Sequence, residues 1–114
     1  MTNLRSQQCV PCRKGEPPLS RDEIEALRPH VPAWEIEDIE GIPRLRRTFK
    51  FKNFALALAF TNKIGELAEA QDHHPTLTTT WGRVDVEWYT TAIENLHRND
   101  FIMAARTDEA FAAG

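Results

Sequence analysis

The stretch 53–75 reads NFALALAFTNKIGELAEAQDHHP, and it decides how the rest of the chain is arranged. Apolar residues recur in it at helical spacing and Asn53 is a candidate N-cap, so the stretch predicts a long central helix that reaches about Gln71. Pro75 disfavours the α conformation at the residue before it and therefore ends the helix before His74. Two adjacent histidines, His73 and His74, are thus expected where this helix ends.

The apolar face of the central helix is wider than one face of a sheet needs. We expect its core stripe to comprise Phe54, Ala57, Leu58, Thr61, Ile64 and Ala68, widened by Leu56, Phe60 and Leu67. A chain of 114 residues is one small domain, which gains stability from association. We therefore predict a homodimer or higher oligomer.

The segments on either side of the central helix alternate at the period of β-strands. Before the helix they flank the turn signal Glu40-Gly41, and after it they flank Gly82-Arg83, so each side predicts a β-hairpin. We expect the core faces of the two hairpins to carry Trp34, Ile36, Leu45, Phe49, Phe51, Val84, Val86 and Trp88.

Two shorter helices complete the chain. The capping box Ser20-Arg-Asp-Glu23 predicts a helix that stops before Pro29, and Asn99 is expected to cap another that runs to about Glu109. The order α-β-β-α-β-β-α predicts an α+β fold, a four-stranded antiparallel sheet with helices packed on one face. Residues 1–18 are interpreted as a flexible N-terminal tail, and residues 19–110 as the folded domain.

Both cysteines lie in the predicted tail, as Cys9-Val-Pro-Cys12. A lone pair of thiols cannot complete a tetrahedral metal site without other ligands. We interpret the pair as reduced and solvated, with zinc binding or redox chemistry as the alternative.

Composition excludes several classes of function. The chain is 41% hydrophobic and 27% charged with a net charge of −3, which is ordinary for a soluble globular protein and argues against a nucleic-acid surface. The longest apolar run, residues 54–60, is too short to span a bilayer, and no secretory leader is recognisable at the N-terminus. We expect a cytoplasmic protein that binds neither nucleic acid nor membrane.

The two histidines are the chain's candidate proton-transfer groups. Glu69 precedes His73 by four residues, so on one helical face its carboxylate is expected to accept the imidazole N–H and fix the tautomer. His74 is expected to point elsewhere, so that one ring serves as acid and the other as base. A metal site is disfavoured, because neighbours in an extended segment point to opposite sides and neither His30 nor His97 has ligand spacing to them.

The pattern Glu-x-x-x-His-His-Pro of residues 69–75, the aromatic Trp81 and the later Asn-Asp-Phe-Ile segment resemble the pterin-4a-carbinolamine dehydratase family. The resemblance covers residues 19–108. It implies dehydration of a 4a-hydroxytetrahydropterin to the quinonoid dihydropterin without a metal or organic cofactor. The roles that it implies are catalysis by His73, His74 and Glu69, and substrate binding by Trp81, Thr91 and Asp100.

Two of these residues also have structural interpretations. Trp81 suits ordinary strand packing as well as a slot for a flat heterocycle. Asp100 is interpreted as structural, because the helix dipole favours Asp in a first helical turn.

Thr91 stands where the family pattern has a third histidine, or sometimes a tryptophan. A hydroxyl does not titrate near neutral pH, so the substitution predicts weak or absent turnover. Some members that resemble this family act as RuBisCO assembly factors in chloroplasts and α-carboxysome systems, and Thr91 with the Cys9–Cys12 segment favours that assembly, or chaperone, role. The alternative is an active dehydratase in pterin recycling. A transcription-factor partner, known among animal members, has no supporting feature here.

Overall fold

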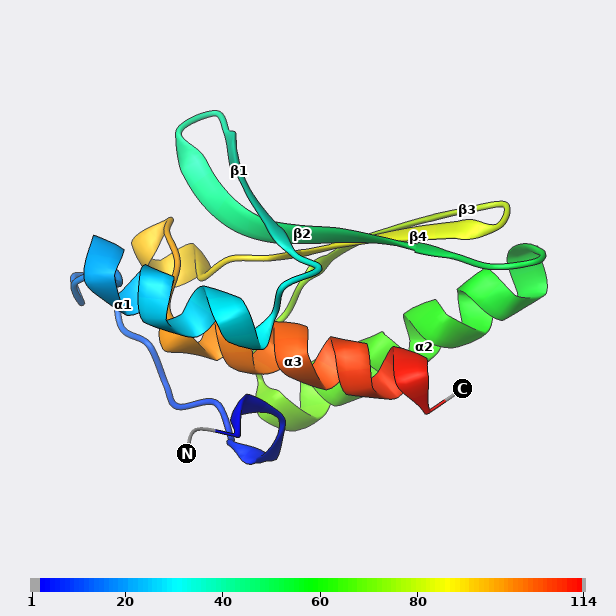
Figure 1. Cartoon of the computed structure of the whole chain (residues 1–114), viewed down its shortest axis with the longest axis horizontal. Helices are drawn as coiled ribbons and strands as arrows, with labels where there is room; N and C mark the ends of the chain where they lie inside the picture. The colour runs from blue at the N-terminus through cyan, green and yellow to red at the C-terminus, as the bar shows by residue number, and fades with distance from the viewer. Residues whose placement is uncertain (1–2, 114) are drawn as a thin grey trace.

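The protein is described by a computed structural model over residues 3–113 (Figure 1). The elements follow the predicted order, with short 3-10 turns between them. They are α1 Arg21–Leu27, β1 Glu35–Ile39, β2 Ile42–Lys50, α2 Phe54–Gln71, β3 Thr76–Thr80, β4 Arg83–Trp88 and α3 Arg98–Ala112, with 3-10 turns at Leu4–Ser6, Arg28–His30 and Thr91–Ile93.

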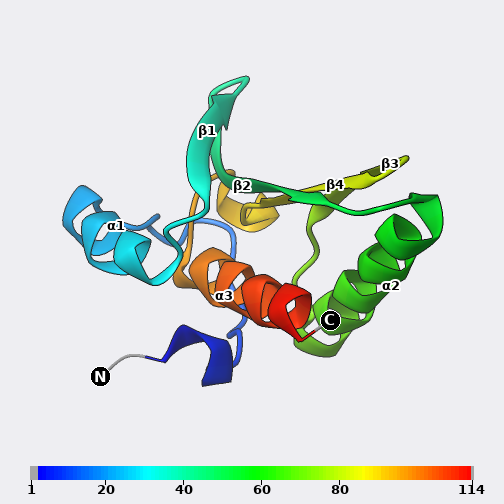
Figure 2. The same ribbon diagram turned by 45° about the vertical axis from the view of Figure 1, so that its right-hand side comes forward.

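The four strands form one antiparallel sheet in the order β1-β2-β4-β3. Figures 1 and 2 show α2 and α3 on the same face of this sheet, which confirms the predicted α+β architecture. None of the helices within residues 3–113 is both long and apolar enough to cross a membrane.

The core lies between the sheet and the two long helices. Alternate residues of β2 and β4 point into it, as the strand period predicts. The largest fully buried side chains include Leu45 and Phe49 from β2, Val84, Val86 and Trp88 from β4, Ile64 from α2, and Phe101 and Met103 from α3.

The central helix begins where predicted, but its buried face is rotated. Asn53 caps α2 by accepting the backbone N–H of Leu56. The predicted stripe is wrong at Phe54 and Leu58, which are 45% and 42% exposed, and Phe60 is buried instead. The α2 face that packs under the sheet therefore runs through Ala57, Phe60, Ile64 and Ala68.

Two predicted boundaries are wrong by one or two residues. In the second hairpin Thr80 pairs with Arg83, so the turn consists of Trp81 and Gly82 rather than Gly82 and Arg83. In α3 the N-cap is His97 rather than Asn99, because His97 Nδ1 accepts the backbone N–H of Asn99 while the Asp100 carboxylate accepts that of His97. This reciprocal capping leaves the Asn99 side chain free for another partner.

The described part of the N-terminal segment, residues 3–18, lies against the domain. Leu4 is 2% exposed and belongs to the core cluster. The Arg106 guanidinium donates hydrogen bonds to the carbonyl oxygen of Gln7. Figure 2 shows the segment passing beside α3 on its way to α1.

Candidate active site

The end of α2 sends the two histidines in different directions. Asp72 adopts the left-handed conformation, with φ of 50°, and donates its N–H to carbonyls of the last helical turn. The N–H of His73 then bonds back to the carbonyl of Ala68 at 3.1 Å. Such a left-handed C-terminal cap reverses the chain at once. His73 is thereby directed towards α3, and His74 lies near the surface.

His73 is held between a carboxylate and an indole. Its Nε2 lies 2.6 Å from Oδ1 of Asp100, and its ring stacks on that of Trp88 at 5.6 Å between centroids and 11° between planes. Its side chain is 11% exposed. Because the carboxylate accepts, Nε2 carries the proton in the neutral ring, and Nδ1 remains the nitrogen that can take another.

Asp100 is fully buried, and its oxygens are occupied by three donors. Besides His73, it accepts the hydroxyl of Thr90 at 2.8 Å and the backbone N–H of His97 at 2.9 Å. A buried carboxylate needs such partners to offset its lost hydration. The first turn of α3 therefore fixes the histidine through a carboxylate that never reaches the surface.

The predicted pairing of Glu69 with His73 is wrong. An i,i+4 contact needs a helix that continues through His73, and α2 ends at Gln71. Instead the Glu69 carboxylate contacts Nε2 of His74, where both side chains are largely exposed, at 78% and 56%. Glu69 can orient His74, and Asp100 takes the role that was expected of Glu69.

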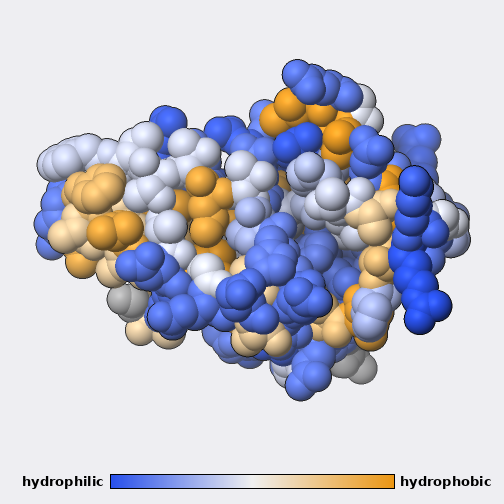
Figure 3. Space-filling view, turned by 180° about the vertical axis from the view of Figure 1, so that it is seen from behind, coloured by the Kyte–Doolittle hydropathy of each residue, from blue (hydrophilic) through white to orange (hydrophobic). Residues whose placement is uncertain are grey.

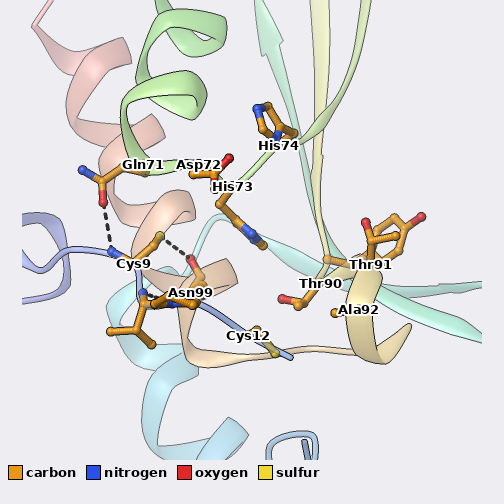
Figure 4. Close-up of a pocket in the computed structure, with 13 residues that line it drawn as sticks. Cys9, Cys12, Gln71, Asp72, His73, His74, Thr90, Thr91, Ala92 and Asn99 are labelled. Atoms are coloured by element: carbon orange, nitrogen blue, oxygen red, sulfur yellow. Dashed lines mark hydrogen bonds between the residues drawn. The ribbon is translucent and has the colours of Figure 1, made fainter. Parts of the chain in front are cut away.

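A pocket of about 470 Å³ opens beside the histidines, within the range of small-ligand sites. Three segments wall it: the end of α2 with Gln71 to His74, the segment from Tyr89 to Ala92, and the N-terminal Cys9 to Cys12 with Asn99 beside it. Figure 4 shows His73 projecting between Cys9 and Thr90, with His74 and Thr91 also at this pocket.

The structure brings some of the predicted site residues together and separates one. His73, His74 and Thr91 line the same pocket, Asp100 lies behind His73, and Glu69 lies at the edge through His74. Trp81 does not line it: the early hairpin turn leaves Trp81 73% exposed. The turn between β3 and β4 lies at the end of the sheet where α2 begins (Figure 1). A slot formed by Trp81 within one chain is therefore not present among the described residues.

Other residues at this site were not predicted as functional. Gln71, Thr90 and Asn99 either line the pocket or hold its walls, and the Cys9–Cys12 segment was interpreted as a solvated tail. Asn99 stood next to Asp100 in the motif, but it was interpreted as a helix cap. Sequence gave no sign of the tail's position, because that depends on contacts between residues about 90 positions apart.

Cys12, Glu16 and His97 form a cluster whose ligand-type atoms lie within 4.8 Å of one another. The nitrogen facing Glu16 is His97 Nε2, at 3.9 Å, while Nδ1 accepts the backbone N–H of Asn99. Nε2 therefore carries the proton in the neutral ring and offers no lone pair to a cation. The cluster fits a hydrogen-bonded attachment of the tail better than a metal.

Neither thiol is activated as a nucleophile. Burial raises the pKa of Cys9 to about 11, against which the nearby Arg106 charge acts in the opposite direction. Burial likewise raises the pKa of Cys12, and the hydrogen bond with Glu16 adds to this. Both cysteines are free thiols that remain protonated at neutral pH.

Comparison with known proteins gives consistent matches. The family model described as pterin 4 alpha carbinolamine dehydratase matches residues 17–110. Proteins named "Putative pterin-4-alpha-carbinolamine dehydratase" are similar over nearly the whole chain: that of Chlorobium limicola is 59% identical over 107 residues, covering 94% of this chain and 95% of the relative. That of Microcystis aeruginosa is 50% identical over 111 residues, covering 97% and 96%.

Two solved structures have similar folds. A transcriptional coactivator/pterin dehydratase from Brucella melitensis superposes with a TM-score of 0.72 at 28% identity, covering 82% of this chain and 98% of the other. A pterin dehydratase-like protein identified as a RuBisCO assembly factor in the α-carboxysome gives a TM-score of 0.59 at 23% identity, covering 71% and 92%. The second likeness shows a shared fold.

Proposed function

Because this chain belongs to the pterin 4 alpha carbinolamine dehydratase family, we propose that its pocket binds a 4a-hydroxytetrahydropterin and dehydrates it. The observation that carries the proposal is the hydrogen bond from His73 to the fully buried Asp100 beside a pocket of suitable size. A buried carboxylate is costly to retain, and here it serves to orient an imidazole that lines the pocket.

The dehydration breaks the C4a–O bond and the N5–H bond, and it yields the quinonoid dihydropterin and water. One group must give a proton to the departing hydroxyl, and another must take the proton from N5. Asp100 fixes the proton of His73 on Nε2, which leaves Nδ1 as the base. His74 is exposed and exchanges protons with water, so it serves as the acid. The protons balance, and the site returns to its starting state through solvent.

Thr91, in place of a third histidine, should lower the rate of dehydration but leave the pocket and its two histidines in place. It lies on the pocket wall where the family pattern has a third imidazole, and its hydroxyl neither gains charge nor loses it near neutral pH. Loss of one general acid or base typically costs about 10² to 10⁴ in rate. We expect turnover about 10²-fold or more below that of a family member with three histidines.

Steady-state dehydration of a 4a-hydroxytetrahydropterin, generated in situ by a pterin-dependent hydroxylase, tests the proposal. The wild-type chain should turn it over slowly but above the uncatalysed rate, and His73→Gln should abolish the excess. His30→Gln is the matched control, because His30 lies on the 3-10 turn Arg28–His30 and does not line this pocket. A wild-type rate equal to that of the His73→Gln variant would overturn the proposal.

A RuBisCO assembly role is the second candidate. Its support is Thr91 and the fold shared with the α-carboxysome assembly factor. From the sequence alone we favoured this assembly role over dehydration. We now favour dehydration, because binding a protein partner does not require an imidazole oriented by a buried carboxylate. Reconstitution of RuBisCO from its subunits with and without the chain tests it: assembly that depends on the chain and survives His73→Gln would favour this role. A cytoplasmic location stays a prediction.

A further inference from the structure

The segment Cys9–Cys12 lies before the residues matched by the family model, 17–110, yet it forms one side of the pocket. The matches to the curated relatives span 107 and 111 residues and so extend beyond that model into the N-terminal segment. In Figure 4, Cys9 lies on the opposite side of His73 from Thr91, and Cys12 lies below His73. A pocket without this segment would be open to water on one side.

The Asn99 side chain holds the segment by its backbone. Its Oδ1 accepts the N–H of Val10 at 3.0 Å, and its Nδ2 donates to the carbonyl of Val10 at 2.7 Å. Gln71 Oε1 accepts the N–H of Cys9 at 2.9 Å, so the end of α2 is hydrogen-bonded to the same segment. These bonds depend on backbone groups, and their geometry fixes the path of the chain past the pocket.

Further contacts hold the chain on both sides of the Cys9–Cys12 segment. Upstream, the carbonyl of Gln7 accepts from Arg106, and Leu4 is buried in the core. Downstream, Glu16 approaches His97, and the N–H of Leu19 bonds to the carbonyl of Leu96 at 3.1 Å. The segment is thus fastened before and after the pocket.

Adjacent residues of α3 fix two different walls of the pocket. Asp100 positions His73, and its neighbour Asn99 positions the Cys9–Cys12 segment. Both side chains are buried, at 0% and 3% exposure. The geometry of one helical turn therefore sets the distance between the proton-transfer group and the opposite wall.

We propose that the segment Cys9–Cys12 is a wall of the pterin site that sets affinity for the ligand, and that Asn99 is the positioning residue that holds this wall. The inference rests on the proposed function, because it assigns the segment to the same pocket. The wall excludes water from the bound heterocycle and increases its buried surface. It contributes no proton, since both thiols remain protonated at neutral pH. Its loss should weaken binding and leave the proton-transfer step largely intact.

Binding of 7,8-dihydrobiopterin, a pterin that does not react, tests this by isothermal titration alongside the dehydratase assay. Asn99→Ala removes both bonds to Val10, and Gln71→Ala removes the bond to the N–H of Cys9. We expect each variant to raise the Kd and the KM by about tenfold or more, with kcat within about threefold of wild type. Asn62→Ala, an exposed asparagine of α2, is the matched control and should change none of these values.

The outcomes separate this inference from the proposed function. If the wild type binds 7,8-dihydrobiopterin and both variants bind it equally well, the role of the Cys9–Cys12 segment in affinity is refuted, and the proposed pterin site is retained. If kcat falls with Kd unchanged, Asn99 acts through its neighbour Asp100, and the inference is overturned. A wild-type chain that binds no pterin overturns both the site and the wall.

Discussion

His73 and Asp100, 27 residues apart in the chain, are joined by a 2.6 Å hydrogen bond between Nε2 and Oδ1. The carboxylate is fully buried, and the imidazole lines the pocket. Asp100 also accepts hydrogen bonds from the Thr90 hydroxyl and from the backbone N–H of His97, the N-cap of α3. One side chain therefore ties the end of α2, the segment after β4 and the start of α3 into a single site.

Asp100→Asn should impair turnover more than binding. The asparagine keeps the size of the side chain, but an amide that donates to Nε2 would move the ring proton to Nδ1, where the base is needed. We expect a fall in kcat of about 10² or more, and a loss of about 1–3 kcal/mol in the free energy of unfolding. Steady-state kinetics, chemical denaturation and ¹⁵N NMR of the imidazole measure these effects.

Glu69→Gln is the matched control for that substitution. It makes the same carboxylate-to-amide change at an exposed contact with His74, where solvent screens the interaction. We expect a change in kcat of about twofold or less. If Glu69→Gln lowered kcat as much as Asp100→Asn does, Glu69 would matter to turnover as much as Asp100, and the roles given to the two carboxylates would be wrong.

The fold could be predicted from the sequence because its signals are local. The capping box at Ser20, the Asn53 cap, the Glu40-Gly41 turn and the alternation of Val84, Val86 and Trp88 each depend on neighbours a few residues away. The resemblance found the histidine pair in the same way. These elements have the predicted type. Their boundaries differ from prediction by one or two residues at the second turn and at the start of α3, and by three residues at the end of α3, which runs to Ala112 rather than Glu109.

The parts of the site that sequence missed depend on long-range contacts. If α2 continued through residue 73, Glu69 would lie beside His73. Asp72 is left-handed and ends the helix, so the His73 ring contacts Asp100 instead. The position of the N-terminal segment is set by Asn99, which is 89 residues from Val10. No periodicity within either segment carries that information.

Cys9 should react slowly with alkylating agents. With a pKa of about 11 against an ordinary value of 9.0, about one Cys9 in 10³ is a thiolate at pH 8. Iodoacetamide labelling followed by mass spectrometry should show a rate that keeps rising to about pH 11, and the chain unfolded in urea is the control. Equal rates in the folded and unfolded chains would mean that the segment does not bury Cys9.

The same raised pKa predicts a pH dependence of stability. The folded state holds the Cys9 proton more tightly than the unfolded state, so the stabilisation is complete below about pH 9 and is lost as the pH rises towards 11. Cys9→Ala should flatten this part of the profile of unfolding free energy against pH. A profile of unchanged slope would contradict the assignment.

The chain should form a dimer or a larger oligomer. Phe54, Leu56 and Leu58 remain 42–47% exposed on α2, and Figure 3 shows apolar side chains gathered at the end of the molecule where α2 begins. Leu58→Lys should shift light scattering at micromolar concentration towards the monomer mass. Ile39→Lys, at an exposed apolar residue of β1, is the matched control. A monomeric wild-type chain would refute the prediction.

Thr91→His tests most directly the claim that the site is intact apart from one imidazole. We expect this variant to raise kcat for 4a-hydroxytetrahydropterin by about 10²-fold, because it restores one general acid or base to a pocket that already holds His73 and His74. Thr80→His, an exposed threonine at the far end of β3, should leave kcat unchanged. Contradiction would come from a folded Thr91→His variant whose kcat does not exceed that of the wild type.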